Sequence, residues 1–383
     1  MSTCPNTKSN PVMRKRRKTP LTYTSVGVNY EAMDPLKRLA QIQARKTAVN
    51  FRHFGMKEIK ASRGESAYVW EEQGSYRAFV IEGLGTKNLV ADETKKITGK
   101  TYYDKIAQDT VAMIVNDIIV VGAQPQVINA YFATGSPEWF SDEKRIGDLV
   151  KGWAKACHLA GAVWGGGETP TLKGIIEPET IDLAGSCIGI IKPKTRLTLG
   201  EKLRVGDRII LVESNGIHAN GLTLARKVAD LLPKSYATKL KNGKMYGEAL
   251  LKPTHIYVKF IQDLFKAKVE IHYMVNITGH GWRKLMRAER NFTFIIEKVP
   301  RVPEEFLLIQ KVSGNDDQEM YGSFNMGAGF AIYVPEKNVR KVTSVAKKHN
   351  LRILNAGYVE KGAKRVVIKP KNIVFEQKTL NVR

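Results

Sequence analysis

The chain has 383 residues, of which 43% are hydrophobic, and this suffices for two domains with separate cores. A disordered or fibrous protein is therefore excluded. The net charge is +24 and is unevenly placed, because residues 1–20 carry +6, residues 21–191 carry −1 and residues 192–383 carry +19. This excess fits partners that carry phosphate, and it equally fits a basic surface that only keeps the protein soluble.

Residues 1–20 contain the basic cluster Arg14–Lys18 and several prolines, and we expect them to be disordered. They hold no apolar stretch typical of a secretory signal, and no apolar run approaches the roughly 20 residues of a membrane span. Three cysteines, far apart and odd in number, exclude a disulfide framework and a zinc site made of cysteines alone. We expect a cytoplasmic protein, although the cluster would also serve as a nuclear address.

Strands and helices alternate along the first half of the chain. The predicted strands are Arg77–Ile81, Val127–Ala133, Ala162–Trp164 and Thr180–Ile191, and the predicted helices are Tyr103–Val121 and residues 142–160. A polar, basic and turn-rich stretch follows Ile191 and marks a domain boundary.

The second half repeats this alternation. Its predicted strands are Arg208–Val212, Ile271–Val275, Phe292–Glu297, Gly329–Val334, Ile353–Tyr358 and Val366–Ile368, and its predicted helices are Leu222–Leu232, Thr254–Ala267, Gly281–Arg287 and Glu336–His349. Each half is therefore expected to be a sheet covered by helices. The predicted fold class is two-domain α+β or α/β, with a tail over 1–20, an N-terminal domain over 21–191 and a C-terminal domain over 192–383.

A glycine-marked segment, Glu82–Lys87, follows the first predicted strand. Gly83 and Gly85 allow backbone amides to approach an anion, while Thr86 and Lys87 offer groups for phosphate oxygens or a magnesium ion. The spacing is not that of a P-loop, so a tight exit from the strand explains the pattern as well.

Polar residues interrupt the apolar helix over 103–121. Asp109 and Asn116 are seven positions apart, which places them on one face of the helix, and Asp117 follows directly. A carboxylate among Val, Met and Ile side chains is rarely buried unless it is paired or holds a metal. The alternative is an ordinary ion pair with a neighbouring lysine.

Two further acidic residues accompany glycines. Glu168 follows the triple glycine Gly165–Gly167, and Asp182 lies within the last strand of the first half. Together with Glu82 and Asp117 they offer the oxygen ligands that magnesium prefers, and magnesium normally shares its shell with substrate phosphates. These residues indicate nucleotide chemistry.

Two turns of the second half lie between a strand and a helix. Ser214–Gly221 contains His218, and Asn276–Gly281 contains Thr278. Such turns present helix N-terminal amides to an anion, and a histidine can titrate near neutral pH. A single histidine in a loop is nevertheless more often structural.

Taken in chain order, these segments resemble the aminoimidazole ribonucleotide synthetase family, also called phosphoribosylformylglycinamidine cyclo-ligase. The resemblance runs from about Tyr23 to Ile368. It is carried by TSVGVNYEAMDPL (24–36), GLGTK (83–87), AQDTVAMIVNDIIVVGAQP (107–125), YFATG (131–135), GGETPTLKG (166–174), IDLAGSCIGII (181–191), SNGIHANGLTLARK (214–227), LLKPTHIYVK (250–259), NITGHGW (276–282) and EMYGSFNMGAGF (319–330).

The resemblance implies a homodimer whose N-terminal domains pair through a β-barrel, with the active site between the domains and across the dimer. It implies ATP and Mg²⁺ as cofactors and a small nucleotide substrate. In this family ATP phosphorylates the formyl amide oxygen of formylglycinamidine ribonucleotide, the amidine nitrogen attacks that carbon, and the imidazole ring of a purine precursor closes with release of ADP and phosphate.

The motifs and the resemblance together assign roles to individual residues. The expected metal ligands are Glu82, Asp117 and Glu168, and the expected catalytic residues are Asp117, His218 and Lys87. The expected cofactor contacts are Gly83, Gly85, Thr86, Lys87, Asp109, Asn116, Asp182 and Asn220. The expected substrate contacts are Ser214, His218, Asn276, Thr278 and Asn325.

The sequence departs from the family pattern at three single positions and in one segment. The family has an aspartate where Glu82 stands, a histidine where Asn276 stands and a glycine where His280 stands. Residues 57–77 replace a flexible glycine-rich segment that closes over substrates in the family. These departures leave open another ATP-dependent enzyme of the superfamily with a different acceptor.

A third alternative is a catalytically quiet homologue associated with nucleic acid. The Arg14–Lys18 cluster and the charge of the second half suggest it. No known reader motif or basic stripe with interleaved aromatic residues supports it, so nucleic acid is the less favoured partner.

Overall fold

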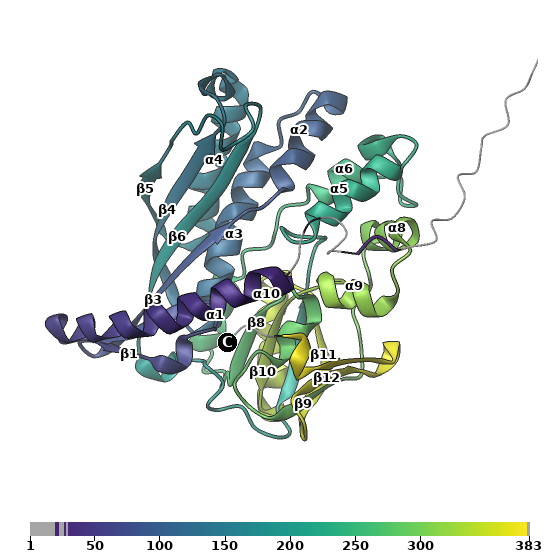
Figure 1. Ribbon diagram of the computed structural model, residues 1–383. Coiled ribbons are helices and arrows are strands. Elements are labelled where there is room, and N and C mark those ends of the chain that lie inside the picture. The colour runs from purple at the N-terminus through teal and green to yellow at the C-terminus, as the bar shows by residue number, and fades with distance from the viewer. Residues whose placement is uncertain (1–19, 23–26, 28–29, 381–383) are drawn as a thin grey trace, which may run out of the picture.

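The computed structural model describes residues 20–22, 27 and 30–380, with the backbone alone for residues 30–34. The disorder predicted for the tail falls on residues 1–19, outside the described part. The described residues form two sheets, one from each half of the chain, each with helices packed on it (Figure 1). None of the helices within them combines the length and apolar character needed to cross a bilayer.

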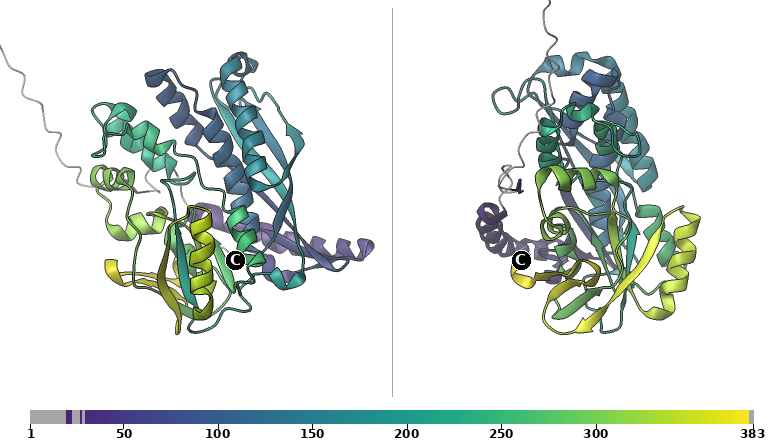
Figure 2. Two further views of the ribbon diagram at one scale, coloured as in Figure 1. Left: turned by 180° about the vertical axis from the view of Figure 1, so that it is seen from behind. Right: turned by 90° about the vertical axis from the view of Figure 1, so that its right-hand side faces the viewer.

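The first sheet has six strands in the order β1-β2-β3-β6-β4-β5. Their bounds are β1 Lys57–Glu58, β2 Tyr68–Glu72, β3 Ser75–Gly83, β4 Gln124–Thr134, β5 Val163–Glu168 and β6 Ile181–Ile191. Neighbours are antiparallel except β4 and β5, which are parallel. The helices α2 (Lys87–Thr98), α3 (Tyr103–Val120) and α4 (Glu143–Ala160) lie on one side of this sheet (Figures 1 and 2).

Alternation along β6 explains how the sheet faces are divided. Leu183, Gly185 and Cys187 are buried, whereas Asp182, the second residue of the strand, is exposed. Successive side chains of a strand point to opposite faces, so one face packs on the helices and the other stays open. The helix α3 is buried along almost its whole length, because it lies between the first sheet and the second half.

An arm precedes the first sheet. It consists of α1 (Tyr30–Thr47) and the 3₁₀ helix η2 (Ala48–Phe54), and it extends beyond the end of the sheet (Figure 1). No side chain over residues 35–47 is buried. The hydrophobic pattern did not predict this helix, because no face of it packs on a core within the described chain.

The second sheet has seven strands in the order β13-β12-β9-β11-β7-β10-β8. Their bounds are β7 Arg208–Glu213, β8 Tyr273–Asn276, β9 Phe292–Ile296, β10 Ala328–Val334, β11 Ile353–Lys361, β12 Arg365–Ile368 and β13 Ile373–Glu376. The helices of this half are α5 Leu222–Leu231, α6 Tyr246–Leu250, α7 Val258–Lys266, α8 Glu304–Ser313, α9 Asp317–Ser323 and α10 Val339–Lys348.

Three predicted elements differ from the structure. Residues 281–287 were expected to form an α-helix but form the 3₁₀ helix η7 (Gly281–Met286). The helix expected from Thr254 begins only at Val258. The triple glycine, expected after a short strand, lies inside β5.

Candidate active site

Two groups of polar side chains lie along α3, where this helix meets the second half. We call the first the tie cluster, made of Lys87, Gln108, Asp109 and Asn116. We call the second the acid cluster, made of Glu82, Asp117, Asn276 and Lys284. The two aspartates are eight positions apart, which corresponds to about 12 Å along the helix.

Lys87 forms the centre of the tie cluster. Its ammonium Nζ lies 2.8 Å from Asp109 Oδ2, and neither side chain has any exposed area. The same ammonium donates to the carbonyl oxygens of His218 at 2.8 Å and of Lys252 at 2.9 Å. Because an ammonium has three donors, Lys87 has none left for a phosphate in this arrangement.

Asp109 and Gln108 bind the same residue of the second half. Asp109 Oδ1 accepts from the backbone N–H of Thr254 at 2.8 Å and from the Thr254 hydroxyl. Gln108 Nε2 donates to the Thr254 carbonyl at 2.9 Å. Burial lowers the pKa of Lys87 and raises the pKa of Asp109, and the opposite charge of each partner opposes both shifts.

Asn116 completes the tie cluster about two turns further along the same face of α3. Its Nδ2 donates to the His255 carbonyl at 2.7 Å, and its Oδ1 accepts from the Tyr257 N–H at 3.0 Å. These bonds satisfy backbone groups ahead of α7, which explains why that helix begins only at Val258. The structure therefore brings the predicted cofactor contacts Lys87, Asp109 and Asn116 together, but on partners within the chain.

The acid cluster is built differently. Glu82 lies on the same face of β3 as the buried Ala78 and Val80, so its half-buried side chain points toward α3. Asp117 is 5% exposed, and its Oδ1 accepts from Asn276 Nδ2 at 2.6 Å. Burial, followed by the negative charge of Asp117, raises the pKa of Glu82 to about 8.

Lys284 supplies positive charge to this cluster and was not predicted from the sequence. It is buried, and its ammonium donates to the Thr278 hydroxyl. Burial lowers the pKa of Lys284, while the charges of Asp117 and Glu82 raise it. Two neighbouring carboxyl groups thus face one buried ammonium, and their mutual repulsion favours a cation or a proton between them.

Glu168 does not join the acid cluster within one chain. Gly83, Ala184, Tyr131 and Glu168 form one row across β3, β6, β4 and β5. Residues of one row share a face, so Glu168 lies on the open face and Glu82 on the other, three strand spacings or about 14 Å apart. Accordingly, no group of three acidic, His or Cys side chains suited to a metal occurs among the described residues.

The glycines beside Glu82 have open space around them. A Cβ on Gly85 would meet nothing within 4 Å, and a Cβ on Gly83 would meet only the Leu183 carbonyl at 4.0 Å. Gly85 has a φ of +73°, which favours glycine. Thr86 precedes the first residue of α2 and makes no side-chain capping bond, so the first backbone N–H groups of this helix receive no side-chain cap.

Asn325 shapes the turn that begins at Ser214. Its Oδ1 accepts from the Ser214 hydroxyl and from the Gly327 N–H, each at 2.9 Å. Its Nδ2 donates to the carbonyls of Gly216 and Ile217 at 3.0 and 3.1 Å. The predicted substrate contacts Ser214 and Asn325 therefore meet, and their polar atoms hold the turn in place.

His218 sits in that turn with a φ of +61° and 4% exposure. Burial lowers its pKa well below the ordinary value, and the charges of His255 and Lys87 act in the same direction. Its Nε2 has no hydrogen-bond partner in the described part of the chain. Asn220 is half-buried, and its Nδ2 donates to Met113 Sδ at 3.4 Å.

The segment over residues 57–77 is attached to the second half. Tyr273 donates its hydroxyl to Glu65 Oε2 at 2.9 Å, and Arg287 donates to the Gly64 carbonyl at 3.0 Å and to Ser66 Oγ at 2.9 Å. A cavity of about 520 Å³ lies between this segment, α1 and the end of β3 at Glu82. These contacts could not be predicted from the sequence, because their partners are more than 200 residues apart.

The two-sheet architecture, with carboxyl groups where the two halves meet, is the two-domain α+β class that the sequence predicted. The profile described as AIR synthase related protein, N-terminal domain, matches residues 64–191, and the corresponding C-terminal domain profile matches residues 204–369. The chain belongs to this family, and the predicted family and fold class are confirmed.

Relatives with curated names extend over nearly the whole chain. The phosphoribosylformylglycinamidine cyclo-ligase of Carboxydothermus hydrogenoformans is 34% identical over 370 residues, with 91% of this chain and 98% of the relative covered. That of Pyrococcus furiosus is 37% identical over 338 residues, covering 88% and 92%. A crystal structure of the hydrogenase maturation protein HypE in complex with ATP has a TM-score of 0.52 at 18% identity, covering 73% of this chain and 81% of that chain, and shows the same fold.

Proposed function

We propose that this chain is an ATP-dependent cyclo-ligase of purine biosynthesis. It would close the imidazole ring of formylglycinamidine ribonucleotide to give aminoimidazole ribonucleotide, ADP and phosphate. The near full-length likeness to enzymes of that name supports the reaction. The observation that carries the site is the pair of adjacent carboxyl groups, Glu82 and Asp117, at the contact of the two halves.

These two carboxyl groups fit Mg²⁺, which is commonly bound by one or two carboxylates while substrate phosphates and water complete its shell. When bound, the ion would neutralise charge that develops on the transferred phosphoryl group. Glu82, with a pKa of about 8, holds a proton near neutral pH in the metal-free chain. Cation binding should therefore release that proton.

The remaining groups position the reactants. Asn276 fixes the orientation of Asp117, and Lys284 adds a buried positive charge beside it. Gly83, Gly85 and the start of α2 leave space for a phosphate to reach backbone N–H groups. We assign the barrier lowering mainly to this positioning and to charge stabilisation of the phosphorylated amide.

His218 is assigned to the substrate side of this site. Its low pKa keeps the ring neutral, so it can hydrogen-bond through Nε2 without adding charge next to the attacking amidine nitrogen. The tie cluster serves this assignment indirectly, because Lys87 holds the His218 carbonyl at 2.8 Å. In this proposal Lys87, Asp109 and Asn116 position the second half and do not touch ATP.

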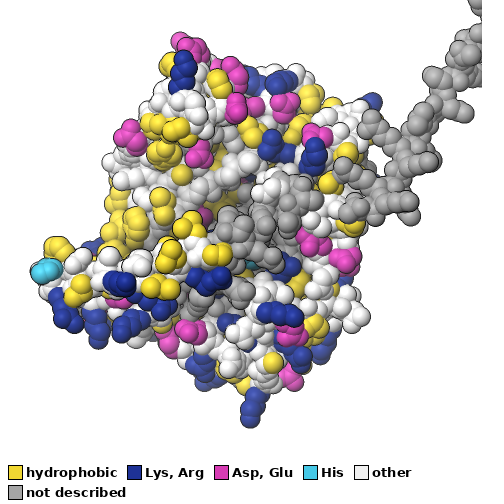
Figure 3. Space-filling model, in the orientation of Figure 1, with side chains coloured by type: hydrophobic (Ala, Val, Ile, Leu, Met, Phe, Trp, Pro, Cys, Tyr) yellow, Lys and Arg dark blue, Asp and Glu magenta, His cyan; other side chains and the backbone are white. Residues whose placement is uncertain are grey.

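We also propose that a second copy of the chain covers the open face of the first sheet. Phe79, Ile81, Val127 and Val163 are 37% to 69% exposed there, and apolar side chains gather over this face and along the arm (Figure 3). Contiguous exposed apolar side chains of this kind mark interaction sites. Glu168 and Asp182 lie on the same face, so a dimer would bring them to its interface.

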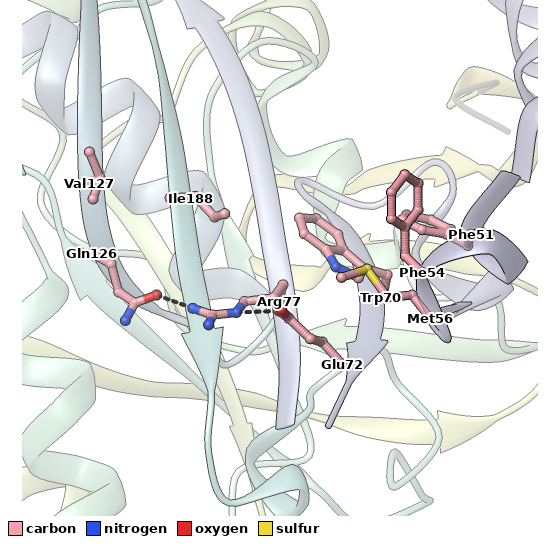
Figure 4. Close-up of a pocket in the computed structure, with 9 residues that line it drawn as sticks. All are labelled: Phe51, Phe54, Met56, Trp70, Glu72, Arg77, Gln126, Val127 and Ile188. Atoms are coloured by element: carbon pink, nitrogen blue, oxygen red, sulfur yellow. Dashed lines mark hydrogen bonds and ion pairs between the residues drawn. The ribbon is translucent and has the colours of Figure 1, made fainter. Parts of the chain in front are cut away.

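A cavity of about 570 Å³ adjoins this face. Phe51, Phe54 and Trp70 line one side of it, and Arg77, which bonds Gln126 at 2.6 Å, forms part of its floor (Figure 4). Side chains of a second copy would fill it. Ile81→Glu should convert the dimer to a monomer in light scattering, whereas Val374→Glu, at an exposed position of β13 in the second sheet, should not.

The reaction is tested by measuring ADP release with ATP, Mg²⁺ and formylglycinamidine ribonucleotide. Release should depend on all three. Release that does not need this ribonucleotide would favour another acceptor, as the Glu82 and Asn276 departures allow, and no release from a folded dimer would contradict the proposal. Thermal shift separates the acceptors, because a ligand at 100 times its Kd adds about 2.7 kcal/mol of stability.

The division of the chain follows from this assignment. We propose an ATP- and metal-binding domain over 21–191, a second domain over 192–383 and a basic tail over 1–20 that takes no part in catalysis. The proposed setting is the cytoplasm. Deletion of residues 1–20 should leave ADP release unchanged.

A further inference from the structure

The outer surface of α7 and α10 carries positive charge that the proposed reaction does not use. The two helices pack together, with His349 Nε2 2.9 Å from Asp263 Oδ2 and the rings of Phe260 and His349 5.9 Å apart. Figure 2 shows α10 on the outside of the second sheet, away from α3. We call the exposed cations of this surface the basic face: Lys259, Lys268, Arg340, Lys341, Lys347 and Lys348.

The basic face has one sign of charge along α10. Val342, Val345 and Ala346 of this helix are buried against the sheet, while its exposed charged side chains are all basic. From Lys337 to Val359 the chain has six basic residues and no acidic residue. A surface that serves solubility alone interleaves both signs, so this run calls for another explanation.

Ion pairs do not neutralise these cations. The nearby acids are engaged elsewhere, because Asp263 pairs with Lys266 at 2.9 Å and Glu270 with Lys337 at 3.0 Å. Glu336 lies 3.2 Å from Arg208. Within the described residues, the six members of the basic face have no acidic partner within 4.0 Å, and a polyanion would supply the missing charge.

The composition of the face favours nucleic acid over a protein partner. Protein interfaces have an apolar or aromatic core depleted of lysine, but the exposed large hydrophobic residues described in the second half are Val205, Leu307 and Val374, none of them on α7 or α10. Phosphate backbones need only cations. Arg340 and Lys347 span about 10 Å, a length over which one DNA strand presents about three phosphates.

We propose that the basic face binds the phosphate backbone of nucleic acid without reading the bases. It does so apart from the acid cluster, so the inference does not depend on the proposed reaction. Contacts of this kind release counterions, so the affinity falls steeply as salt rises.

The test measures binding of the full chain to a 20-base-pair mixed-sequence DNA duplex. Binding is monitored by fluorescence anisotropy at salt concentrations between 50 and 200 mM. Four phosphate contacts predict a loss of affinity of roughly 100-fold over this range. The variant R340Q/K341Q/K347Q/K348Q should bind at least about 10-fold more weakly at 50 mM salt, with a shallower salt dependence.

The matched control is K234Q/K239Q/K241Q/K244Q, which removes the same charge from four exposed lysines without ion pairs in the segment around α6. It should change the affinity by less than about twofold, and the α10 variant should keep its circular dichroism and its ADP release. An equal loss in the control would overturn the proposal. The proposal would also be overturned if the α10 variant bound DNA normally and only deletion of residues 1–19 abolished binding. Absence of binding at 50 mM salt, or tighter binding to poly-glutamate than to DNA, would likewise overturn it.

Discussion

The two clusters along α3 use the same residue type for opposite purposes. In the tie cluster, Asp109 meets a buried lysine and two donors from Thr254, so its charge is fully compensated. In the acid cluster, Asp117 meets one amide and lies beside a second carboxyl group, Glu82, whose pKa rises to about 8.

This difference separates a structural charge from a functional one. A buried ion pair with complete hydrogen bonding holds two parts of a chain in register, and it leaves no capacity for a ligand. Adjacent carboxyl groups that repel each other are costly in the folded chain, and a bound cation would relieve that repulsion. Breaking each cluster should therefore have different consequences.

The largest effect is expected from Lys87→Met. The substitution leaves Asp109 buried without its cation and should lower the free energy of unfolding by about 3–5 kcal/mol, measured by urea denaturation. Combining it with Asp109→Leu should restore much of the loss, since the buried charge is then removed.

Lys100→Met serves as the matched control, because this lysine is exposed beyond the end of α2. It should change stability by less than about 0.5 kcal/mol. If Lys87→Met instead kept its stability but lost turnover, Lys87 would be a catalytic residue and the tie cluster would not be structural.

The next effect concerns Asp117→Asn. The new side chain can still accept from Asn276, so the fold should persist, but the charge that the phosphoryl chemistry needs is lost. We expect turnover to fall roughly 100- to 1000-fold, measured as ADP release. Asp104→Asn, at an exposed position of the same helix, should leave turnover unchanged, and full activity in the Asp117 variant would remove it from the metal site.

Most of the contacts that distinguish the two clusters could not be predicted from the sequence. The seven-residue spacing correctly placed Asp109 and Asn116 on one face of α3, because helical periodicity is local. It could not reveal their partners, since Lys87 is 22 positions away and Thr254 is 145 positions away. Asp109 was therefore predicted to contact a cofactor and Asp117 to bind metal, although Asp109 instead pairs with Lys87 and Thr254 within the chain.

The fold shows the same division between local and distant information. Strands such as β3 and β6 and the helix α3 were predicted closely, because their burial imposes a strong hydrophobic pattern. The polar helix α2 and the exposed α1 were missed, since neither has a strong apolar stripe. Glu168 was placed with Glu82 by motif, whereas strand register puts them on opposite faces.

A smaller effect, dependent on pH, is expected from Glu82→Gln. The folded chain holds the Glu82 proton up to about pH 8, whereas an unfolded glutamate releases it near pH 4.3. The folded state therefore binds more protons between these values, and its stability falls as pH rises through this window.

Glutamine does not titrate, so the variant does not lose this stability as pH rises. The variant should be more stable than the parent at pH 8 by about 1–3 kcal/mol in metal-free buffer, and the gain should vanish by pH 4. Chemical denaturation at both pH values measures it. An equal difference at both would mean that packing, and not titration beside Asp117, accounts for the change.

The smallest effect is expected from Gln108→Ala, which removes one hydrogen bond from the tie cluster. The lost bond to the Thr254 carbonyl spans 2.9 Å, and deletion of one such bond costs about 0.5–1.5 kcal/mol of stability. Asp109 still holds Thr254 through its N–H and hydroxyl, so KM and kcat should stay within about twofold of the parent. A large change in turnover with little loss of stability would show that the tie cluster transmits strain to the acid cluster. The two clusters would then act as one site.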